Sequence, residues 1–294
     1  MNGFNTAASI LPITLNGALL ILPECQRSVI EEIRLRAGQA MTVLINGSEI
    51  EIAPEHRITM YELESVLECA TGASVHSVET SIANGYINIS GGVRLGICGT
   101  AILRSGTVSG IRNLSSLSLR IPSERYGCAS KELNKMLTEG LSDILIVSPP
   151  GAGKTTCLRE YIRVISNMGY RVSVADERGE IAAVYKGIAQ FDVGAHTDIM
   201  SDAPKAKAAM MMIRSMNPNV LAMDEVSSKE DIDAVLDAYG CGVRLLATTH
   251  AYSLEDLYSR KEYRRLMEEK VFRYCLLIRN SNGVRNYCVE ELRL

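Results

Sequence analysis

The sequence predicts an α/β protein with two domains. Residues 1–122 should form a smaller α+β domain, and residues 123–294 a larger domain around a mostly parallel sheet. Three observations predict this. An Asn-Gly hairpin lies in the first part, a glycine-rich loop separates a strand from a helix in the second, and further apolar strands then alternate with helical stretches. The short polar segment RIPSERYG, residues 120–127, suits a hinge between the two.

The amino-acid composition indicates a globular protein and argues against several kinds of binding site. The chain is 47% apolar and 22% charged, which is enough to form real hydrophobic cores. A net charge of −3 without a run of basic residues argues against DNA or RNA binding. The eight cysteines form no closely spaced pair and the four histidines are scattered, so we expect reduced thiols, a cytoplasmic protein and no zinc site.

In the first part, residues 7–23 are the most apolar stretch. They contain Pro12, Asn16 and Gly17 and follow no basic segment, so we expect an extended piece and a short core helix, not a signal peptide or membrane span. Residues 41–52 predict two paired strands around an Asn-Gly turn. Thr59 and Glu62 form a capping box that predicts a helix, and GYINISGGVRLGICGTAIL predicts further strands.

The segment SPPGAGKTT, residues 148–156, predicts a phosphate-binding loop. The usual pattern is glycine, four residues, glycine, lysine and serine or threonine, and only its first glycine is replaced, by Ser148. Ser148 precedes a proline and should be extended. Proline has no N–H, so the phosphate donors form an unbroken run after the two prolines: Gly151, Ala152, Gly153, Lys154, Thr155 and Thr156. The loop should therefore bind phosphate without its first glycine.

The parallel strands predict where the remaining chemistry lies. Ligands bind beyond the carboxyl ends of such strands, where Asp176, Asp224, Glu225 and Thr249 fall. With ATP bound, Lys154 should contact the β and γ phosphates and Thr155 should ligate Mg²⁺. Asp224, at the end of the acidic strand VLAMDE, should orient the waters of that metal ion.

Two carboxylates are candidates for polarising the attacking water. Glu225 follows Asp224 on the acidic strand. Glu177 lies at the tip of RVSVADERGE, a strand that comes between the loop strand and the acidic strand, an order typical of ATPases with an added central strand. We favour Glu225, while the residues alone leave both open. The end of LLATTHA supplies candidate sensors of the γ phosphate: Thr248, Thr249 and His250.

Three arginines near the hinge are candidates for acting on a neighbouring copy of the chain: Arg94, Arg112 and Arg120. Phosphoryl transfer gains from an arginine supplied from outside the site. The competing interpretation for each is ordinary surface charge or an ion pair within the first domain.

Four segments in order resemble the secretion and pilus motor ATPases: SPPGAGKTT, VADERGEI, NPNVLAMDEVSSKEDIDAV and LLATTHA. The segment EEIRLRAGQAMTVLINGSEI resembles their N-terminal domain. The stage III sporulation protein AA family is a closer match, through GGVRLGICG, GIRNLSSLSLRIPSE and ADERGEIAA. The first resemblance implies a RecA-like ATPase domain. The closer one implies a cytoplasmic ATPase of the mother cell of an endospore-forming bacterium.

The resemblance also implies an assembly. Such an ATPase would act as a ring, commonly a hexamer, and would energise a transmembrane complex between mother cell and forespore, reaching the membrane through its partners. One departure, Asp-Glu where pilus motors usually have Gly-Glu, keeps the choice of catalytic base open. The alternative function is a nucleotide-gated scaffold with little intrinsic hydrolysis. A nucleotide kinase, a GTPase and a DNA translocase are disfavoured, since no arginine-rich lid, Asn-Lys-x-Asp motif or basic arm is evident.

Overall fold

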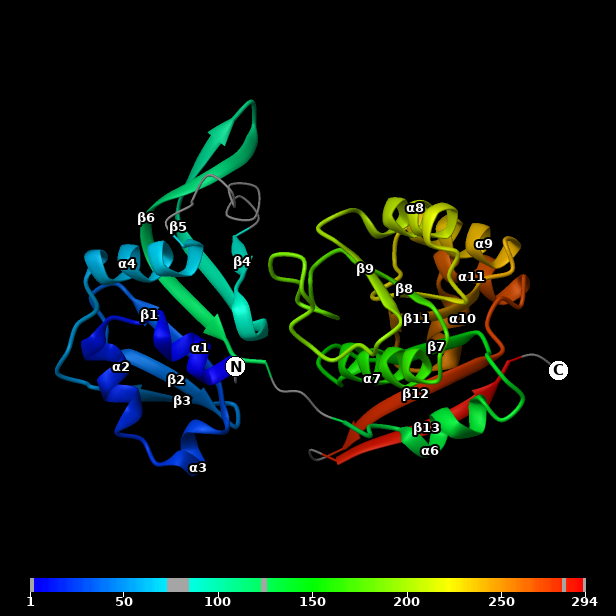
Figure 1. Cartoon of the computed structure of the whole chain (residues 1–294), viewed down its shortest axis with the longest axis horizontal. Coiled ribbons are helices and arrows are strands. Elements are labelled where there is room, and N and C mark those ends of the chain that lie inside the picture. Colours follow the sequence, from blue (N-terminus) through cyan, green and yellow to red (C-terminus); the bar gives the residue numbers. More distant parts are fainter. Residues whose placement is uncertain (1–2, 73–84, 123–125, 282–283, 293–294) are drawn as a thin grey trace. The chain divides into compact units, whose positions relative to one another are not determined.

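The computed structural model describes residues 3–72, 85–122, 126–281 and 284–292, and these form two compact units (Figure 1). The first unit is Met1–Ser123 with Ala183–Gln190, and the second is Glu124–Ala182 with Phe191–Leu294. The fold class is confirmed: an antiparallel sheet unit precedes a mostly parallel α/β unit. The predicted division into domains at residues 122 and 123 stays a prediction. Residues 183–190 were not expected in the first unit, but they belong to it, and Gln190 Oε1 accepts a hydrogen bond from Gly91 N at 2.7 Å.

The first unit is built on one antiparallel sheet of order β3-β2-β1-β6-β5-β4. Its strands are β1 (Ile30–Arg36), β2 (Met41–Ile45), β3 (Ser48–Ile52), β4 (Tyr86–Asn88), β5 (Arg94–Arg104) and β6 (Thr107–Arg120). Its helices are α1 (Gly3–Ser9), α2 (Ile13–Leu20), α3 (Glu24–Arg27) and α4 (Met60–Thr71), with a short 3₁₀ turn over Ser90–Gly92. In Figure 1 the far ends of β5 and β6 form a long hairpin that extends beyond the other strands of this sheet.

Several predictions for this unit are confirmed. Strands β2 and β3 pair around Asn46 and Gly47, and Thr59 begins α4 with the expected capping box to Glu62. The expectation for residues 7–23 is wrong in part. Two helices, α1 and α2, meet near Pro12, which stands immediately before α2, because proline fits a helix start but not its interior.

The second unit has a seven-stranded sheet of order β13-β12-β7-β11-β10-β8-β9. Its strands are β7 (Ile144–Ser148), β8 (Val172–Asp176), β9 (Thr197–Ser201), β10 (Val220–Met223), β11 (Arg244–His250), β12 (Tyr274–Ser281) and β13 (Val284–Glu291). All neighbours are parallel except β12 and β13. Its helices are α6 (Ser130–Met136), α7 (Lys154–Asn167), α8 (Lys205–Met216), α9 (Lys229–Gly240), α10 (Leu254–Ser259) and α11 (Lys261–Glu268).

The helices cover both faces of this sheet. Helix α7 lies on one face, while α8, α9, α10 and α11 pack over the other through a continuous apolar core (Figure 1). Strand β9 was not predicted, because its residues TDIMS do not form an apolar run. In the sheet β11 lies between β7 and β10, whereas β8 lies beyond β10. The residues at the carboxyl ends of β7, β11, β10 and β8 therefore share one edge. No helix in the described ranges has the length and hydropathy needed to cross a membrane.

The amino end of β7 is tied to its neighbour by Asp143, whose side chain is only 1% exposed. Its carboxylate accepts hydrogen bonds from Leu245 N at 3.0 Å and from Arg244 Nη1 at 3.0 Å. We expect Asp143→Ala to lower the free energy of unfolding by about 1–3 kcal/mol, because a buried N–H loses its acceptor. Arg244→Ala removes a half-exposed partner and should cost less than about 1 kcal/mol. Urea unfolding of both variants checks this, and equal costs would contradict it.

Candidate nucleotide site

The phosphate loop connects β7 to α7 as the sequence predicts. Ser148 is the last residue of β7, is buried, and donates its hydroxyl hydrogen bond to Pro149 O at 2.9 Å. Its extended backbone needs no glycine. The left-handed conformations fall later, at Gly151 (φ 72°) and Gly153 (φ 100°). Helix α7 begins at Lys154, and the first N–H groups of a helix have no acceptor within it, so this end is suited to bind an anion.

Lys154 is buried beneath the loop. Its ammonium donates to Ser148 O and Pro149 O, both at 3.3 Å, and lies 2.8 Å from Nδ1 of His250. An ammonium group only donates, so Nδ1 is the acceptor and the ring proton of His250 is on Nε2. Nε2 lies 2.9 Å from Oε1 of Glu225 and donates to it. A chain of hydrogen bonds therefore runs from Lys154 through His250 to Glu225.

Asp224 follows β10 and joins three elements. Its Oδ2 accepts a hydrogen bond from the Thr155 hydroxyl at 2.7 Å, in the first turn of α7. Its Oδ1 accepts from the Thr248 hydroxyl of β11 and from Glu225 N, the latter at 3.1 Å. The carboxylate thus sits between the phosphate-loop helix and the neighbouring strand.

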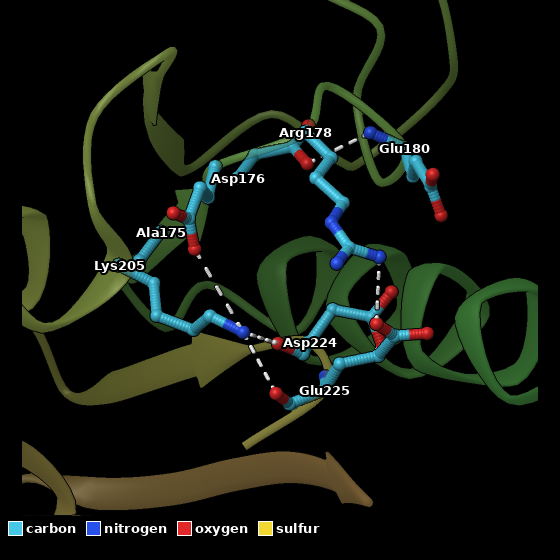
Figure 2. Close-up of a pocket in the computed structure, with 8 residues that line it drawn as sticks. Ala175, Asp176, Arg178, Glu180, Lys205, Asp224 and Glu225 are labelled. Atoms are coloured by element: carbon cyan, nitrogen blue, oxygen red, sulfur yellow. Dashed lines mark hydrogen bonds and ion pairs between the residues drawn. The ribbon is translucent and has the colours of Figure 1, made fainter. Parts of the chain in front are cut away.

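Glu225 is held in an unusual backbone conformation, with φ at 50°. Such a conformation costs a non-glycine residue about 1–3 kcal/mol, so surrounding contacts must stabilise it. Lys205, the first residue of α8, donates to Glu225 O at 2.7 Å and to Asp224 O at 3.1 Å. The side chain of Glu225 uses both oxygens, one with His250 and the other with Arg178 Nη1 at 2.8 Å. Figure 2 shows Arg178 reaching toward Glu225 from the end of β8.

Two carboxylates at the end of β8, those of Asp176 and Glu177, have different surroundings. The carboxylate of Asp176 is buried and accepts hydrogen bonds from the N–H groups of Glu180, Ile181 and Ala182, at 2.9, 3.1 and 2.9 Å. It therefore shapes the turn. Glu177 is 41% exposed and lies 3.8 Å from Lys205 Nζ. These groups line a small pocket that Asp224 and Glu225 also line (Figure 2).

Burial and charge shift three ionisation equilibria here. Burial lowers the pKa of the Lys154 ammonium below its ordinary value, although the carboxylates of Asp224 and Glu225 act in the opposite direction. Burial raises the pKa of Asp176, against its three backbone hydrogen bonds. For Glu225, burial alone would raise the pKa, but the hydrogen bond from His250 and the charge of Arg178 outweigh it, and the pKa is lowered.

The residues present fit a magnesium ion that arrives with a nucleotide. The hydroxyl of Thr155 and the carboxylate of Asp224 supply hard oxygen ligands within 2.7 Å of each other. In the described ranges no group of three or more His, Cys, Asp or Glu side chains could hold a metal by itself. Mg²⁺ is commonly bound by one or two protein oxygens together with substrate phosphates, and Thr155 and Asp224 could supply such oxygens.

The structure brings most of the predicted residues to one edge of the sheet. The loop residues and Lys154, Thr155, Asp224, Glu225 and His250 lie there together, and Glu177 lines the same pocket as Asp224 and Glu225. Thr249 is an exception. It is fully buried and bonds to the Tyr263 hydroxyl and to Val226 O, whereas Thr248 contacts Asp224.

The three candidate arginines lie in the first unit. Arg94 begins β5, stacks on the Tyr86 ring at 3.6 Å, and stands opposite Arg120 in the strand pairing. Arg112 is exposed and pairs with Thr100.

Sequence reasoning missed Lys205, which belongs to no recognisable motif. Only its contacts with the two carbonyls of the acidic strand mark it.

Comparison with known proteins gives the family. The model of the family described as "Sporulation stage III, protein AA" matches residues 8–287. The chain belongs to this family. Stage III sporulation protein AA of Bacillus subtilis (strain 168) is 34% identical over 284 residues, covering 95% of this chain and 92% of that protein.

Solved structures share the fold of this stage III sporulation protein AA family member at low sequence identity. The ATPase DotB of Yersinia pseudotuberculosis has a TM-score of 0.64 at 16% identity, covering 97% of this chain and 81% of that one. The pilus retraction motor PilT with bound ADP has a TM-score of 0.62 at 17% identity, covering 91% and 81%. The fold is therefore that of secretion and pilus ATPases.

The hydrogen bonds of Asp176 predict a structural cost on its removal. We expect Asp176→Ala to lower the free energy of unfolding by about 1–3 kcal/mol, since two buried N–H groups lose their acceptor. The matched change Glu177→Gln, at a half-exposed side chain, should stay within about 0.5 kcal/mol of the parent protein. Both values come from urea unfolding. An Asp176→Ala protein of unchanged stability would show that this carboxylate does not shape the turn.

Proposed function

We propose that this chain is a Mg²⁺-dependent ATPase. The observation that carries the proposal is the hydrogen-bond chain from Lys154 through His250 to Glu225, beside the contact of Thr155 with Asp224. It joins a phosphate-binding lysine to a carboxylate suited to polarise water. The fold shared with the ATPase DotB and the ADP-bound motor PilT supports the same conclusion.

Each residue then has a defined task. The N–H groups of Gly151, Ala152, Gly153, Lys154, Thr155 and Thr156 bind the phosphates, and the Lys154 ammonium neutralises the β and γ phosphates. Thr155 and Asp224 would hold Mg²⁺, which supplies charge neutralisation on the phosphates when bound. Glu225 orients and polarises the attacking water.

His250 links nucleotide binding to the base. When Lys154 turns from His250 Nδ1 to a phosphate oxygen, the imidazole loses its donor and can accept from another group or rotate. Either change in the imidazole alters the hydrogen bond that its Nε2–H donates to Glu225. We assign His250 the role of γ-phosphate sensor on this ground.

Between the two candidate bases, the contacts favour Glu225. It adjoins Asp224 and is hydrogen-bonded to His250, while Lys205 fixes its backbone. Glu177 is 41% exposed, and its carboxylate lies 3.8 Å from Lys205 Nζ. We therefore retain Glu225 as the base and Glu177 as the alternative.

Membership of the family supports a proposal for the setting. We place this ATPase in the cytoplasm of the mother cell, bound to the membrane through partner proteins, where it energises a sporulation channel into the forespore. It acts as a ring, most simply a hexamer, with Arg94, Arg112 or Arg120 of one copy completing the site of the next.

A nucleotide-gated scaffold is the second candidate, and one observation favours it. Both carboxylate oxygens of Glu225 accept hydrogen bonds, from His250 and Arg178, and these contacts lower its pKa, so the carboxylate is a weaker base toward water in this arrangement. A chain that stays in it would bind ATP and assemble without appreciable turnover. Release of Glu225 by a neighbouring copy or a partner would restore hydrolysis.

Substitution of the two carboxylates separates these roles. We expect Glu225→Gln to bind MgATP with near-normal affinity and to lower turnover at saturating ATP about 100-fold or more, because the amide cannot act as a base. Glu177→Gln should stay within a few-fold of the parent. Phosphate release and fluorescent-nucleotide binding measure the two quantities. The reverse pattern would make Glu177 the base.

A further inference from the structure

Arg285 lies at the edge of the sheet that carries the phosphate loop. Strand β12 is parallel to β7, so its carboxyl end points to the same edge as the loop. Strand β13 returns antiparallel, and Arg285, its second residue, pairs with Asn280 near the end of β12. The hairpin of β12 and β13 therefore places Arg285 beside the loop, although it lies far from Gly153 in the sequence.

The guanidinium of Arg285 lies directly against the loop backbone. A Cβ built on Gly153 would lie 3.1 Å from both Nε and Cζ of Arg285 and 3.3 Å from Nη2. The φ of 100° favours glycine at position 153, and its lack of a side chain lets the guanidinium approach the backbone. In the described part of the chain, no hydrogen bond or ion pair of the Arg285 side chain is found.

The order of the strands shows which part of a nucleotide Arg285 faces. Strands β11 and β10, which carry His250 and Glu225, lie on one side of β7, and β12 and β13 lie on the other. A nucleotide with its γ phosphate near His250 and Glu225 has its remaining phosphates on the loop and α7. Arg285 approaches the loop from the flank opposite those two residues.

We propose that Arg285 binds the diphosphate part of the nucleotide, which ATP and ADP share. The proposal rests on the nucleotide binding proposed above and adds a residue from the same chain to that site. A guanidinium paired with phosphate forms strong, charge-assisted hydrogen bonds with a planar fork of donors. Because ATP and ADP both keep this diphosphate, the contact should strengthen the binding of both nucleotides.

The test uses the full chain with Arg285→Ala and Arg285→Lys. Arg279→Ala is the matched control, because Arg279 is an exposed arginine on the same hairpin. Asn280 pairs with Arg285 and shares its face of the sheet, so Arg279, one position earlier, belongs to the opposite face. Binding of MgATP, MgADP and inorganic pyrophosphate is measured by competition with a fluorescent ADP analogue, and turnover at saturating ATP is measured alongside. Melting temperatures establish that each variant is folded.

We expect Arg285→Ala to weaken binding of all three ligands by a similar factor, about tenfold or more. The KM for ATP should rise by a similar factor. Arg285→Lys should recover part of the affinity, because it restores the charge without the fork. Arg279→Ala should match the parent protein in every measurement. Should Arg285→Ala fail to fold, Arg285→Lys provides the test, and we expect it to weaken binding of the same three ligands by a smaller factor.

Three results would overturn the proposal, and they differ from one another. If Arg285→Ala and Arg285→Lys bind like the parent while Lys154→Ala does not bind, Arg285 has no part in a site that does hold nucleotide. If ATP and ADP bind more weakly but pyrophosphate does not, Arg285 contacts the base or ribose. If the parent protein binds none of the ligands, the proposed function itself fails.

Discussion

The hydrogen bond between the Thr155 hydroxyl and the Asp224 carboxylate joins the phosphate-loop helix to the acidic strand, and the rest of the candidate site is arranged around it. Thr248 and the N–H of Glu225 occupy the other carboxylate oxygen. Glu225 is thereby fixed beside the loop in a left-handed conformation that Lys205 stabilises. This contact links the loop helix to the acidic strand in addition to the pairing of β7, β11 and β10.

Parallel pairing makes the contact possible. Strands β7, β11, β10 and β8 all end at one edge, so residues far apart in the sequence meet there without long loops. The same geometry brings β12 to this edge, and the hairpin that follows supplies Arg285 from the other flank. The site is therefore assembled from both sides of the loop strand, with a basic group on one flank and acids and histidine on the other.

The fold class and several local elements could be predicted from the sequence. The phosphate loop, the hairpin of β2 and β3 and the strand ending before Asp224 follow from local patterns of proline, glycine and apolar residues. Ser148 was correctly placed at a strand end. Strand β9, the joining of β12 to β7, and the contacts of Lys205 and Arg285 depend on long-range packing, which no local pattern encodes. The sequence does not show which of Thr248 and Thr249 faces the site, because that depends on how the two faces of β11 pack. Thr248 contacts Asp224, and Thr249 bonds to Val226 O.

The central claim is that this chain hydrolyses ATP at a site completed by a neighbouring copy. The most direct test is ATP turnover per chain as protein concentration rises, with Lys154→Ala as the blank. The account predicts turnover that climbs steeply with concentration and vanishes in the Lys154→Ala protein. Flat turnover equal to the blank at every concentration would contradict an autonomous ATPase, and flat turnover well above the blank would contradict a shared site.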